Sequence, residues 1–511
     1  MISEIYTATT YGVDGFIVRV ETHLETGHHI FSIVGLPDNT VQEARDRVSA
    51  AIKNTGLEFP WTKKITINLS PADKKKEGSA FDLPIALGIL CETEQLKQEL
   101  LKQYVFIGEL SLDGKLRKVP GVLPIAIEAK RKKFKGIILP PENAREGAVV
   151  GGLDVIPLND LSEVMDFLNG KITREPYIVN TKELFDKQED FLIDFSDVKG
   201  QAEVKRALEV AAAGGHNILM IGLPGSGKTM LAKRLPTILP PLTLEEALET
   251  TKIHSIAGRI SSGESLITQR PFRSPHHTAS DVAIVGGGIN IPKPGEISFA
   301  HNGVLFLDEM TQFKKNVLEV MRQPLEDRVV NISRAKMSIK FPCNFMLVAA
   351  MNPSPAANAQ ETAMFSDYEI QKNLMKISGP ILDRIDIHIH VQPVKYNELS
   401  SKVEAEKSFI IRERVIKARN IQLNRFLGEK GIYCNASMSS KDLKKYCEIN
   451  SDCLELMKNA INKIGLSARA YDKILKVSRT IADLEDAAEI SPAHISEAIQ
   501  YRSLDRMEWA M

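Results

Sequence analysis

The chain has 511 residues, more than one hydrophobic core ordinarily supports, so we expect roughly two to four domains. Hydrophobic residues make up 43% and charged residues 25%, the profile of a soluble globular protein. The 65 basic side chains balance 65 acidic ones, so any nucleic-acid contact must come from local patches or from an assembled ring. The five scattered cysteines form no Cys-x-x-Cys pair, which disfavours a disulfide scaffold. Neither a signal-peptide pattern nor a long apolar run occurs, so we expect a cytoplasmic protein with no membrane partner.

Up to about residue 175, short strands are mixed with helices. Apolar runs bounded by turn residues predict strands, and longer amphipathic runs predict helices. The predicted strands cover 15–24, 28–36, 64–70 and 104–110, and the predicted helices cover 40–54 and 81–91. We therefore place an α/β domain at 1–175, followed by a polar, acidic linker at 176–195.

In residues 196–395 strands alternate with helices, which is typical of a parallel sheet with helices on its faces. The buried strands are predicted at 217–222, 303–309, 345–352 and 386–391. Strand signals stop after Pro393, and residues 396–511 predict a helical domain with N-cap signals at Ser439 and Ser491. The predicted fold class is therefore α/β with a C-terminal helical lid.

A phosphate-binding pattern, G-x-x-x-x-G-K-[ST], occurs directly after the first of these strands, and a helix follows it at 228–239. This context argues against a chance match. Backbone N–H groups of the loop would surround the β-phosphate of ATP, Lys228 would reach the β and γ oxygens, and the Thr229 hydroxyl would bind Mg²⁺. The predicted ATP-binding residues are Gly222, Leu223, Pro224, Gly225, Ser226, Gly227, Lys228 and Thr229.

Two later strands end in polar side chains. Asp308 can hold hydrated Mg²⁺, and Glu309 can polarise the attacking water as a general base. Asn352 can orient the same water or contact the γ-phosphate. The alternatives are a strand that ends in exposed acids and an asparagine that only begins the turn at Pro353.

These features, in this order, resemble the AAA+ ATPases. Five longer segments are similar to the magnesium-chelatase-like branch known as the YifB or ComM family: DVKGQAEVKRALEVAAAGGHNILMIGLPGSGKT, RPFRSPHHTAS, GEISFAHNGVLFLDEM, SGPILDRIDIHIHV and LSARAYDKILKVSRTIADL. The resemblance implies ring-shaped oligomers, usually hexamers, that couple ATP and Mg²⁺ to mechanical remodelling.

The same resemblance assigns roles to two arginines. Arg384 matches the arginine finger, which one subunit supplies to the γ-phosphate of its neighbour, and Arg469 matches the second sensor arginine, which reports nucleotide state to the lid. The alternatives are a salt bridge of Arg384 with Asp383 or Asp386 and a solvated helix face for Arg469.

A basic hairpin is predicted at 329–341, with Arg334 and Lys336 near its tip. In related helicases such a hairpin points into the pore, where these two side chains would contact DNA phosphates independently of sequence. The alternative is a surface hairpin with solvated charges. Residues 270–288 predict a moving loop, and its adjacent histidines, His276 and His277, are poor candidates for a metal pair. His388 and His390 share a strand face, but no third ligand is visible.

Lysine-rich runs at 63–64, 74–76 and 130–133 can be a nucleic-acid patch or solvated surface, and the near balance of acids and bases favours the second interpretation. The segments EGSAFDLPIALGIL and GELSLDGKLRKVPGVLPIAIEAKRKKFKGIILPPEN resemble the Lon protease domain, a ribosomal S5-type α/β fold. Ser79 falls near the nucleophile position, but Leu123 occupies the place of the lysine base, so we expect no peptidase. The cysteine cluster that many family members carry after the Asn-Pro pair is absent, so only Mg²⁺ with the nucleotide is implied.

The sequence therefore predicts an ATP-hydrolysing motor. By resemblance it would be a hexameric DNA helicase that promotes branch migration of recombination intermediates during natural transformation, with itself and single-stranded or branched DNA as partners. One alternative is a protein remodeller that uses the Lon-like domain for docking. Another, a magnesium-chelatase motor subunit, is disfavoured because chelatase motors lack that domain.

Overall fold

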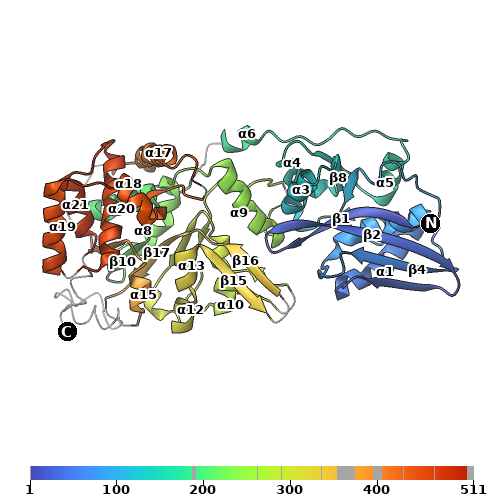
Figure 1. Cartoon of the computed structure of the whole chain (residues 1–511), viewed down its shortest axis with the longest axis horizontal. Coiled ribbons are helices and arrows are strands. Elements are labelled where there is room, and N and C mark those ends of the chain that lie inside the picture. The colour runs from blue at the N-terminus through green and yellow to red at the C-terminus, as the bar shows by residue number, and fades with distance from the viewer. Residues whose placement is uncertain are drawn as a thin grey trace.

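The computed structural model describes residues 2–186, 191–261, 263–288, 291–334, 337–353, 373, 376–394, 405–429, 431–464, 466–502 and 504. The molecule is elongated: the N-terminal sheets lie at one end, the C-terminal helices at the other, and a second α/β unit lies between them (Figure 1). None of the described helices has the length and apolar character needed to cross a lipid bilayer.

The N-terminal region contains two sheets. A four-stranded sheet has the order β1-β2-β4-β3, with only the β3–β4 pair parallel, and a three-stranded parallel sheet has the order β5-β8-β9. The elements are β1 (Ser3–Tyr11), β2 (Asp14–Thr26), β3 (Ile30–Val34), α1 (Asn39–Asn54), β4 (Lys63–Ser70), α2 (Asp82–Glu92), β5 (Tyr104–Phe106), β6 (Glu109–Leu110), β7 (Leu116–Arg117), α3 (Val122–Arg131), β8 (Gly136–Leu139), α4 (Ala144–Ala148), β9 (Asp154–Pro157), α5 (Leu161–Leu168) and α6 (Thr181–Asp186). The predicted strands and helices are confirmed, whereas β1 was not predicted.

The central unit is built on a five-stranded sheet of order β11-β14-β17-β10-β18, in which every pair is parallel. Its elements are α7 (Ala202–Gly214), β10 (Ile218–Gly222), α8 (Lys228–Arg234), α9 (Leu244–Ile256), β11 (Phe272–Arg273), α10 (Asp281–Val285), β12 (Gly286–Gly287), β13 (Lys293–Pro294), α11 (Glu296–Phe299), β14 (Val304–Leu307), α12 (Lys315–Val320), α13 (Arg322–Asp327), β15 (Val329–Arg334), β16 (Met337–Pro342), β17 (Met346–Met351), α15 (Gly379–Leu382) and β18 (Ile387–Val391). The four predicted strands are β10, β14, β17 and β18, so the predicted parallel sheet is confirmed.

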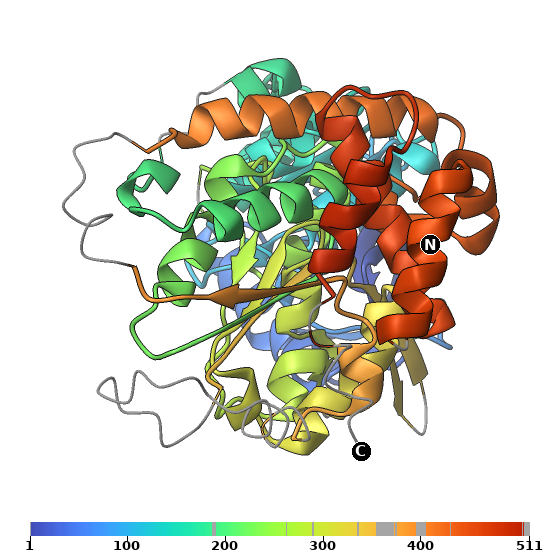
Figure 2. The same cartoon turned by 90° about the vertical axis from the view of Figure 1, so that its left-hand side faces the viewer.

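The C-terminal region is helical over its described residues, as predicted, and comprises α17 (Ser408–Arg425), α18 (Ser440–Tyr446), α19 (Ser451–Ile464), α20 (Ala468–Leu484) and α21 (Pro492–Gln500). Ser439 and Ser491 cap α18 and α21, each with a reciprocal capping box. Alternate residues of the central strands face opposite sides of the sheet, and the side that carries Met220 and Phe306 shares one hydrophobic core with α7, α17 and α20. The C-terminal helices therefore share a hydrophobic core with the central sheet. Figure 2 views the molecule from the end at which these helices lie.

A buried charge network fixes this helical region. The Asp483 carboxylate, 1% exposed, accepts hydrogen bonds from Arg425 at 2.5 and 2.8 Å, from Arg479 at 3.0 Å and from the Asn435 amide at 2.8 Å. Removing one charge of such a network leaves the others buried without compensation.

The substitution Asp483→Asn is accordingly expected to lower the free energy of unfolding by about 3–5 kcal/mol. The matched control is Asp486→Asn, because the Asp486–Lys417 pair is 60% and 63% exposed and should contribute less than about 1 kcal/mol. Urea denaturation followed by circular dichroism measures both changes. Equal stability of the two variants would contradict the role of the network.

Several contacts join the N-terminal region to the central unit, among them one at α9 and one at β16. At the first, the Gly121 N–H that precedes α3 donates to the Ser255 carbonyl of α9 at 3.0 Å, and the Ser255 hydroxyl donates to Glu146 at 2.5 Å. At the second, the turn between β1 and β2 packs on β16: a Cβ atom placed on Gly12 would lie 2.9 Å from Cγ2 of Ile339. The β15–β16 hairpin is thus in direct contact with the N-terminal sheet.

Candidate functional site

The phosphate-binding pattern forms a loop between β10 and α8, as its sequence context predicts. Gly225 and Gly227 have φ angles of +79° and +96°, a region that side-chain-bearing residues rarely adopt. A Cβ atom on either glycine would meet nothing within 4 Å, so the loop borders open space. The Lys228 ammonium donates to the carbonyls of Gly222 at 2.6 Å and Leu223 at 2.8 Å, and burial lowers its pKa.

The predicted Mg²⁺ ligands lie together. The Thr229 hydroxyl donates to Oδ2 of Asp308 at 2.8 Å, which places the first residue after β14 beside the first turn of α8. Oxygen ligands are the donors that Mg²⁺ prefers, and the two groups are held on separate elements of one rigid edge. Lys228, Thr229 and Asp308 therefore fit a magnesium nucleotide with its phosphates over the glycines.

Glu309 is half-buried next to this pair and has a φ angle of +51°, in the left-handed region. A non-glycine residue there carries backbone strain, and such strain concentrates at functional sites. Its backbone N–H donates to Oδ1 of Asp308 at 3.0 Å, so the two acids are held in a fixed relative orientation. This geometry suits the general-base role that the sequence predicts for Glu309.

Asn352 follows β17, which lies between β14 and β10 in the sheet. The register pairs Leu307 with Ala349 and Ile221 with Met351, so Asn352, Asp308 and the phosphate loop share the carboxyl edge of the sheet. Ligands of open α/β sheets bind at this edge. Residues 354–372, where family members carry a cysteine cluster, lie outside the described residues.

Arg384 and Arg469 lie at the opposite edge. Arg384 precedes β18, whose last residue, Val391, is the one that pairs with Gly222 of the phosphate loop. Five residues of strand separate the two edges, roughly 15 Å at about 3.3 Å per residue. Neither arginine can therefore contact a nucleotide held by its own loop, and the predicted sensor Arg469 does not cover the nucleotide of its own chain.

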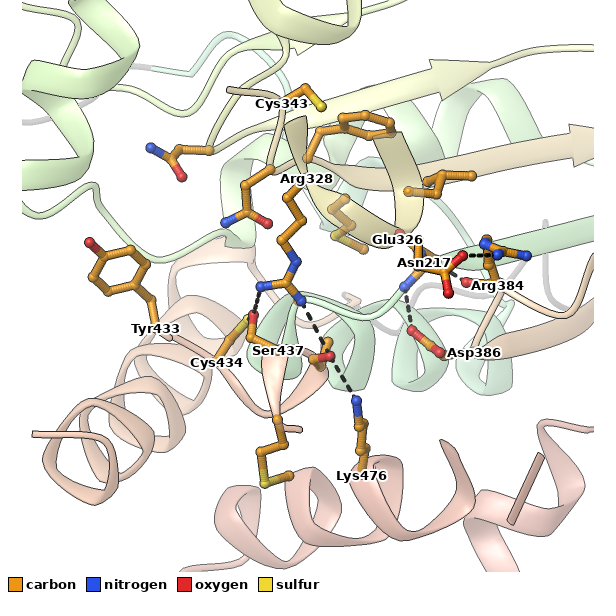
Figure 3. A pocket seen from close by; sticks show the side chains of 18 of the residues that line it. Asn217, Glu326, Arg328, Cys343, Arg384, Asp386, Tyr433, Cys434, Ser437 and Lys476 are labelled. Atoms are coloured by element: carbon orange, nitrogen blue, oxygen red, sulfur yellow. Dashed lines mark hydrogen bonds and ion pairs between the residues drawn. The ribbon is translucent and has the colours of Figure 1, made fainter. Parts of the chain in front are cut away.

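Both arginines line a cavity of about 570 Å³ between the central unit and the C-terminal helices. Arg384 pairs with Glu326 and also donates to the Pro380 carbonyl at 2.5 Å, and among the described residues its buried Nε has no hydrogen-bond partner (Figure 3). The Arg469 side chain, 66% exposed, lies 3.2 Å from the Asp383 carboxylate. Arg384 thus forms a salt bridge, as its alternative stated, but with Glu326 rather than with Asp383 or Asp386. Arg469 is largely exposed, in keeping with its alternative of a solvated helix face, and also pairs with Asp383.

Asn217 is a positioning residue that the sequence analysis missed. Its amide nitrogen donates to the Arg384 carbonyl at 2.9 Å, its side-chain oxygen accepts from the Leu347 N–H at 2.8 Å, and its backbone N–H donates to Asp386 at 3.0 Å. The side chain of Asn217 therefore ties β17 to the Arg384 carbonyl, and its backbone N–H holds Asp386, just before β18. The only sequence signal was an asparagine directly before a buried strand.

The β15–β16 hairpin is confirmed, with Ser333 paired with Ser338 and Arg334 with Met337. Arg334 is exposed, and Lys336 lies outside the described residues. His276 and His277 are not on a strand; their rings lie 4.1 Å apart. His388 is buried, and burial lowers its pKa well below the usual value, as expected of a neutral core histidine. Within the described part of the chain, no group of three or more potential ligand side chains could hold a metal ion.

The two residues at the positions of the Lon serine and lysine have other partners in this structure. The Ser79 hydroxyl donates to Glu109. Leu123 is fully buried, and its N–H donates to Glu146 at 3.0 Å at the contact with α9. A leucine side chain cannot accept a proton. The first turn of α3, which contains Leu123, instead forms part of the contact between the N-terminal region and the central unit.

A phosphate loop at the carboxyl edge of a five-stranded parallel sheet, with helices packed on that sheet, fits the core of an ATPase of the AAA+ class. Family profiles agree: "Magnesium chelatase, subunit ChlI" matches residues 194–399, "Subunit ChlI of Mg-chelatase" matches 20–143, and "Magnesium chelatase, subunit ChlI C-terminal" matches 405–502. The family indicates an ATPase that uses ATP and Mg²⁺.

Full-length relatives narrow the family. The chain is 44% identical to the competence protein ComM of Haemophilus influenzae, over 98% of both chains. It is 42% identical to the uncharacterized protein YifB of Escherichia coli, over 99% of this chain and 98% of that one. A magnesium-chelatase subunit ChlI from Cyanidium caldarium is 23% identical over 48% of this chain. The chain therefore belongs to the YifB/ComM family of magnesium-chelatase-like proteins.

Proposed function

We propose that this chain is an ATPase that assembles into a hexameric ring. The ring uses ATP to move branched DNA and promotes branch migration of recombination intermediates in natural transformation. The observation that supports a ring is that the predicted nucleotide-binding residues and the two predicted arginines lie far apart within one chain. The phosphate loop and Asp308 lie at one edge of the sheet, and Arg384 and Arg469 lie at the other. A head-to-tail ring brings the two edges together between subunits.

Within this interface each residue has a defined task. Backbone N–H groups of the loop and Lys228 hold the phosphates, and Thr229 with Asp308 holds Mg²⁺, which when bound neutralises charge on the phosphate oxygens. Glu309 accepts the proton of the attacking water, and Asn352 orients that water. Arg384 and Arg469 of the adjacent subunit stabilise the charge that develops on the γ-phosphate.

The DNA assignment rests on the likeness to a competence protein and on the β15–β16 hairpin. The buried face of the hairpin carries Ile332 and Ile339, while Arg334 and Lys340 are exposed. An exposed cation at the tip of a hairpin anchored by apolar side chains can contact phosphates without reading sequence. Lys336, which the sequence predicts near this tip, is the second predicted contact.

ATP turnover of the purified chain, with and without a four-way DNA junction, tests this proposal. We expect the junction to stimulate turnover several-fold and the double variant Arg334→Ala/Lys336→Ala to lose that stimulation. The matched control, Lys441→Ala/Lys458→Ala, removes two exposed charges from the C-terminal helices and should keep it. Turnover that is indifferent to DNA would overturn the helicase and direct the search to the alternative, a protein remodeller stimulated by a polypeptide.

A further inference from the structure

Two lysine-rich segments that lie far apart in the sequence meet at one cleft of the N-terminal region. Lys74 comes from the loop after β4, and Arg131 and Lys132 come from the end of α3. The cleft has a volume of about 480 Å³, and the half-buried rings of Tyr11 and Phe16 form part of its wall. Cationic and aromatic side chains therefore line the same hollow.

The charges of this cleft are unevenly compensated. Arg131 is paired with Glu128 at 2.6 Å, and Asp14 lies 4.0 Å from Lys252. Lys74 and Lys132 have no carboxylate within 4.0 Å among the residues that the structure describes.

The Lys74 ammonium instead lies over the rings of Phe16 and Tyr11, 4.7 and 5.9 Å from their centroids. This contact holds the positive charge at the aromatic wall without neutralising it. Lys132, which also lines the cleft, is exposed. Two cations thus remain available to an anionic ligand.

The cleft adjoins the β15–β16 hairpin. Tyr11 and Val13 pack against the hydrophobic core that contains Ile339, and Gly12 lies in close contact with the same residue. Lys340, next along β16, is exposed. The turn between β1 and β2 therefore contacts the hairpin through Gly12 and lines the cleft through Tyr11 and Asp14. Figure 1 shows the ends of β1 and β2 near β15 and β16.

We propose that this cleft is a second binding site for single-stranded DNA, which receives the strand that passes the hairpin. Lys74 and Lys132 contact phosphates, and the rings of Tyr11 and Phe16 offer apolar surface to the bases, the combination that single-strand-binding proteins use. The inference rests on the proposed DNA function, because it extends the path of the same strand. It gives the N-terminal region a role in holding substrate.

The chemistry favours nucleic acid over an acidic peptide. An acidic peptide needs cations alone, whereas the aromatic wall beside the cations suits a ligand that alternates charge with flat rings. The position next to a hairpin with exposed Arg334 and Lys340 gives a nucleic-acid strand further phosphate contacts outside the cleft.

Fluorescence anisotropy with a labelled oligothymidine, over a series of salt concentrations, tests the proposal. Removing two phosphate contacts should lower the slope of log K against log salt by about 1.4, because each contact to a single strand contributes about 0.7. We expect this change, with roughly a tenfold loss of affinity at low salt, for Lys74→Ala/Lys132→Ala. The matched control is Lys97→Ala/Lys102→Ala, because both side chains are exposed in the same N-terminal region. The backbone N–H of Lys97 donates to Asn169, just after α5, and Figure 1 shows α5 at the end of this region away from the β1–β2 turn.

The outcomes separate the two proposals. If the wild-type chain fails to bind the oligonucleotide, the DNA function itself fails. If it binds and Lys74→Ala/Lys132→Ala keeps its slope and affinity while its circular dichroism is unchanged, only the cleft is rejected. Photo-crosslinking of an iododeoxyuridine strand to the peptide that contains Tyr11 or Phe16 would support the cleft, whereas competition by polyglutamate as strong as by oligothymidine would show a general polyanion site and overturn it.

Discussion

Replacing Glu309 by glutamine is expected to lower ATP turnover by at least about a hundredfold while ATP still binds, because a general base contributes about 10²–10⁴ to the rate. The amide keeps the size of the side chain and cannot accept the proton of the attacking water. Lys228, Thr229 and Asp308 remain in place, so the affinity for the nucleotide should change little. Steady-state turnover and equilibrium binding of a fluorescent ATP analogue measure the two effects separately.

Two further variants serve as comparisons for Glu309→Gln. Glu203→Gln, which neutralises an exposed acid on α7, should leave turnover unchanged. Asp308→Asn should instead alter the Mg²⁺ dependence of turnover, since its carboxylate lies 2.8 Å from the Thr229 hydroxyl, the other predicted Mg²⁺ ligand. If Glu309→Gln retained more than about a tenth of the wild-type rate, the base would have to be sought elsewhere at the carboxyl edge.

The nucleotide half of the site could be predicted because its determinants are local. A buried strand, a glycine loop and a helix follow one another within residues 218–234, and Asp308 directly follows β14. In a parallel sheet the ends of neighbouring strands meet at one edge, so strand order alone brings these groups together. The structure adds the left-handed backbone of Glu309, which no pattern of residues signals.

The other half depends on packing between distant segments. The sequence matches Arg384 and Arg469 to their roles only by resemblance. Arg384 lies at the edge opposite Lys228 because it precedes β18, whereas the position of Arg469 depends on the packing of α20 against the sheet, which no local pattern indicates. Asn217 was missed for the same reason: its partners, Leu347, Asp386 and the Arg384 carbonyl, are more than a hundred residues away.

Long-range packing also explains two features of the N-terminal region that the sequence analysis did not predict. The strand β1, with the sequence SEIYTATTY, is rich in threonine, and its Thr7 is buried within the sheet, so its hydrophobic pattern was too weak to predict. The lysine runs at 74–76 and 130–133 were interpreted as solvated surface, and only the fold brings Lys74 and Lys132 to one cleft.

Replacing Arg384 by alanine is expected to lower ATP turnover by about 10³–10⁵, the usual contribution of an arginine finger. The separation of Arg384 from the phosphate loop within one chain makes a sharper prediction possible. The Lys228→Ala subunit has a defective phosphate loop but an intact Arg384. The Arg384→Ala subunit has an intact phosphate loop but no arginine finger. Each variant alone should be inactive, whereas a mixture should recover part of the wild-type turnover, because some interfaces then combine an intact loop with an intact arginine.

Recovery in the mixture depends on which edge of the sheet faces the neighbour, and not on the stability of either variant. Arg322→Ala is the matched control: it removes a nearby arginine that is 45% exposed and pairs with Glu319, and it should keep its turnover. Mixing Lys228→Ala with Glu309→Gln gives a second control, since both changes lie on the loop side and every interface stays defective. An inactive mixture of Lys228→Ala and Arg384→Ala subunits that still assemble, as light scattering would show, would place the arginine finger elsewhere and reject the head-to-tail arrangement.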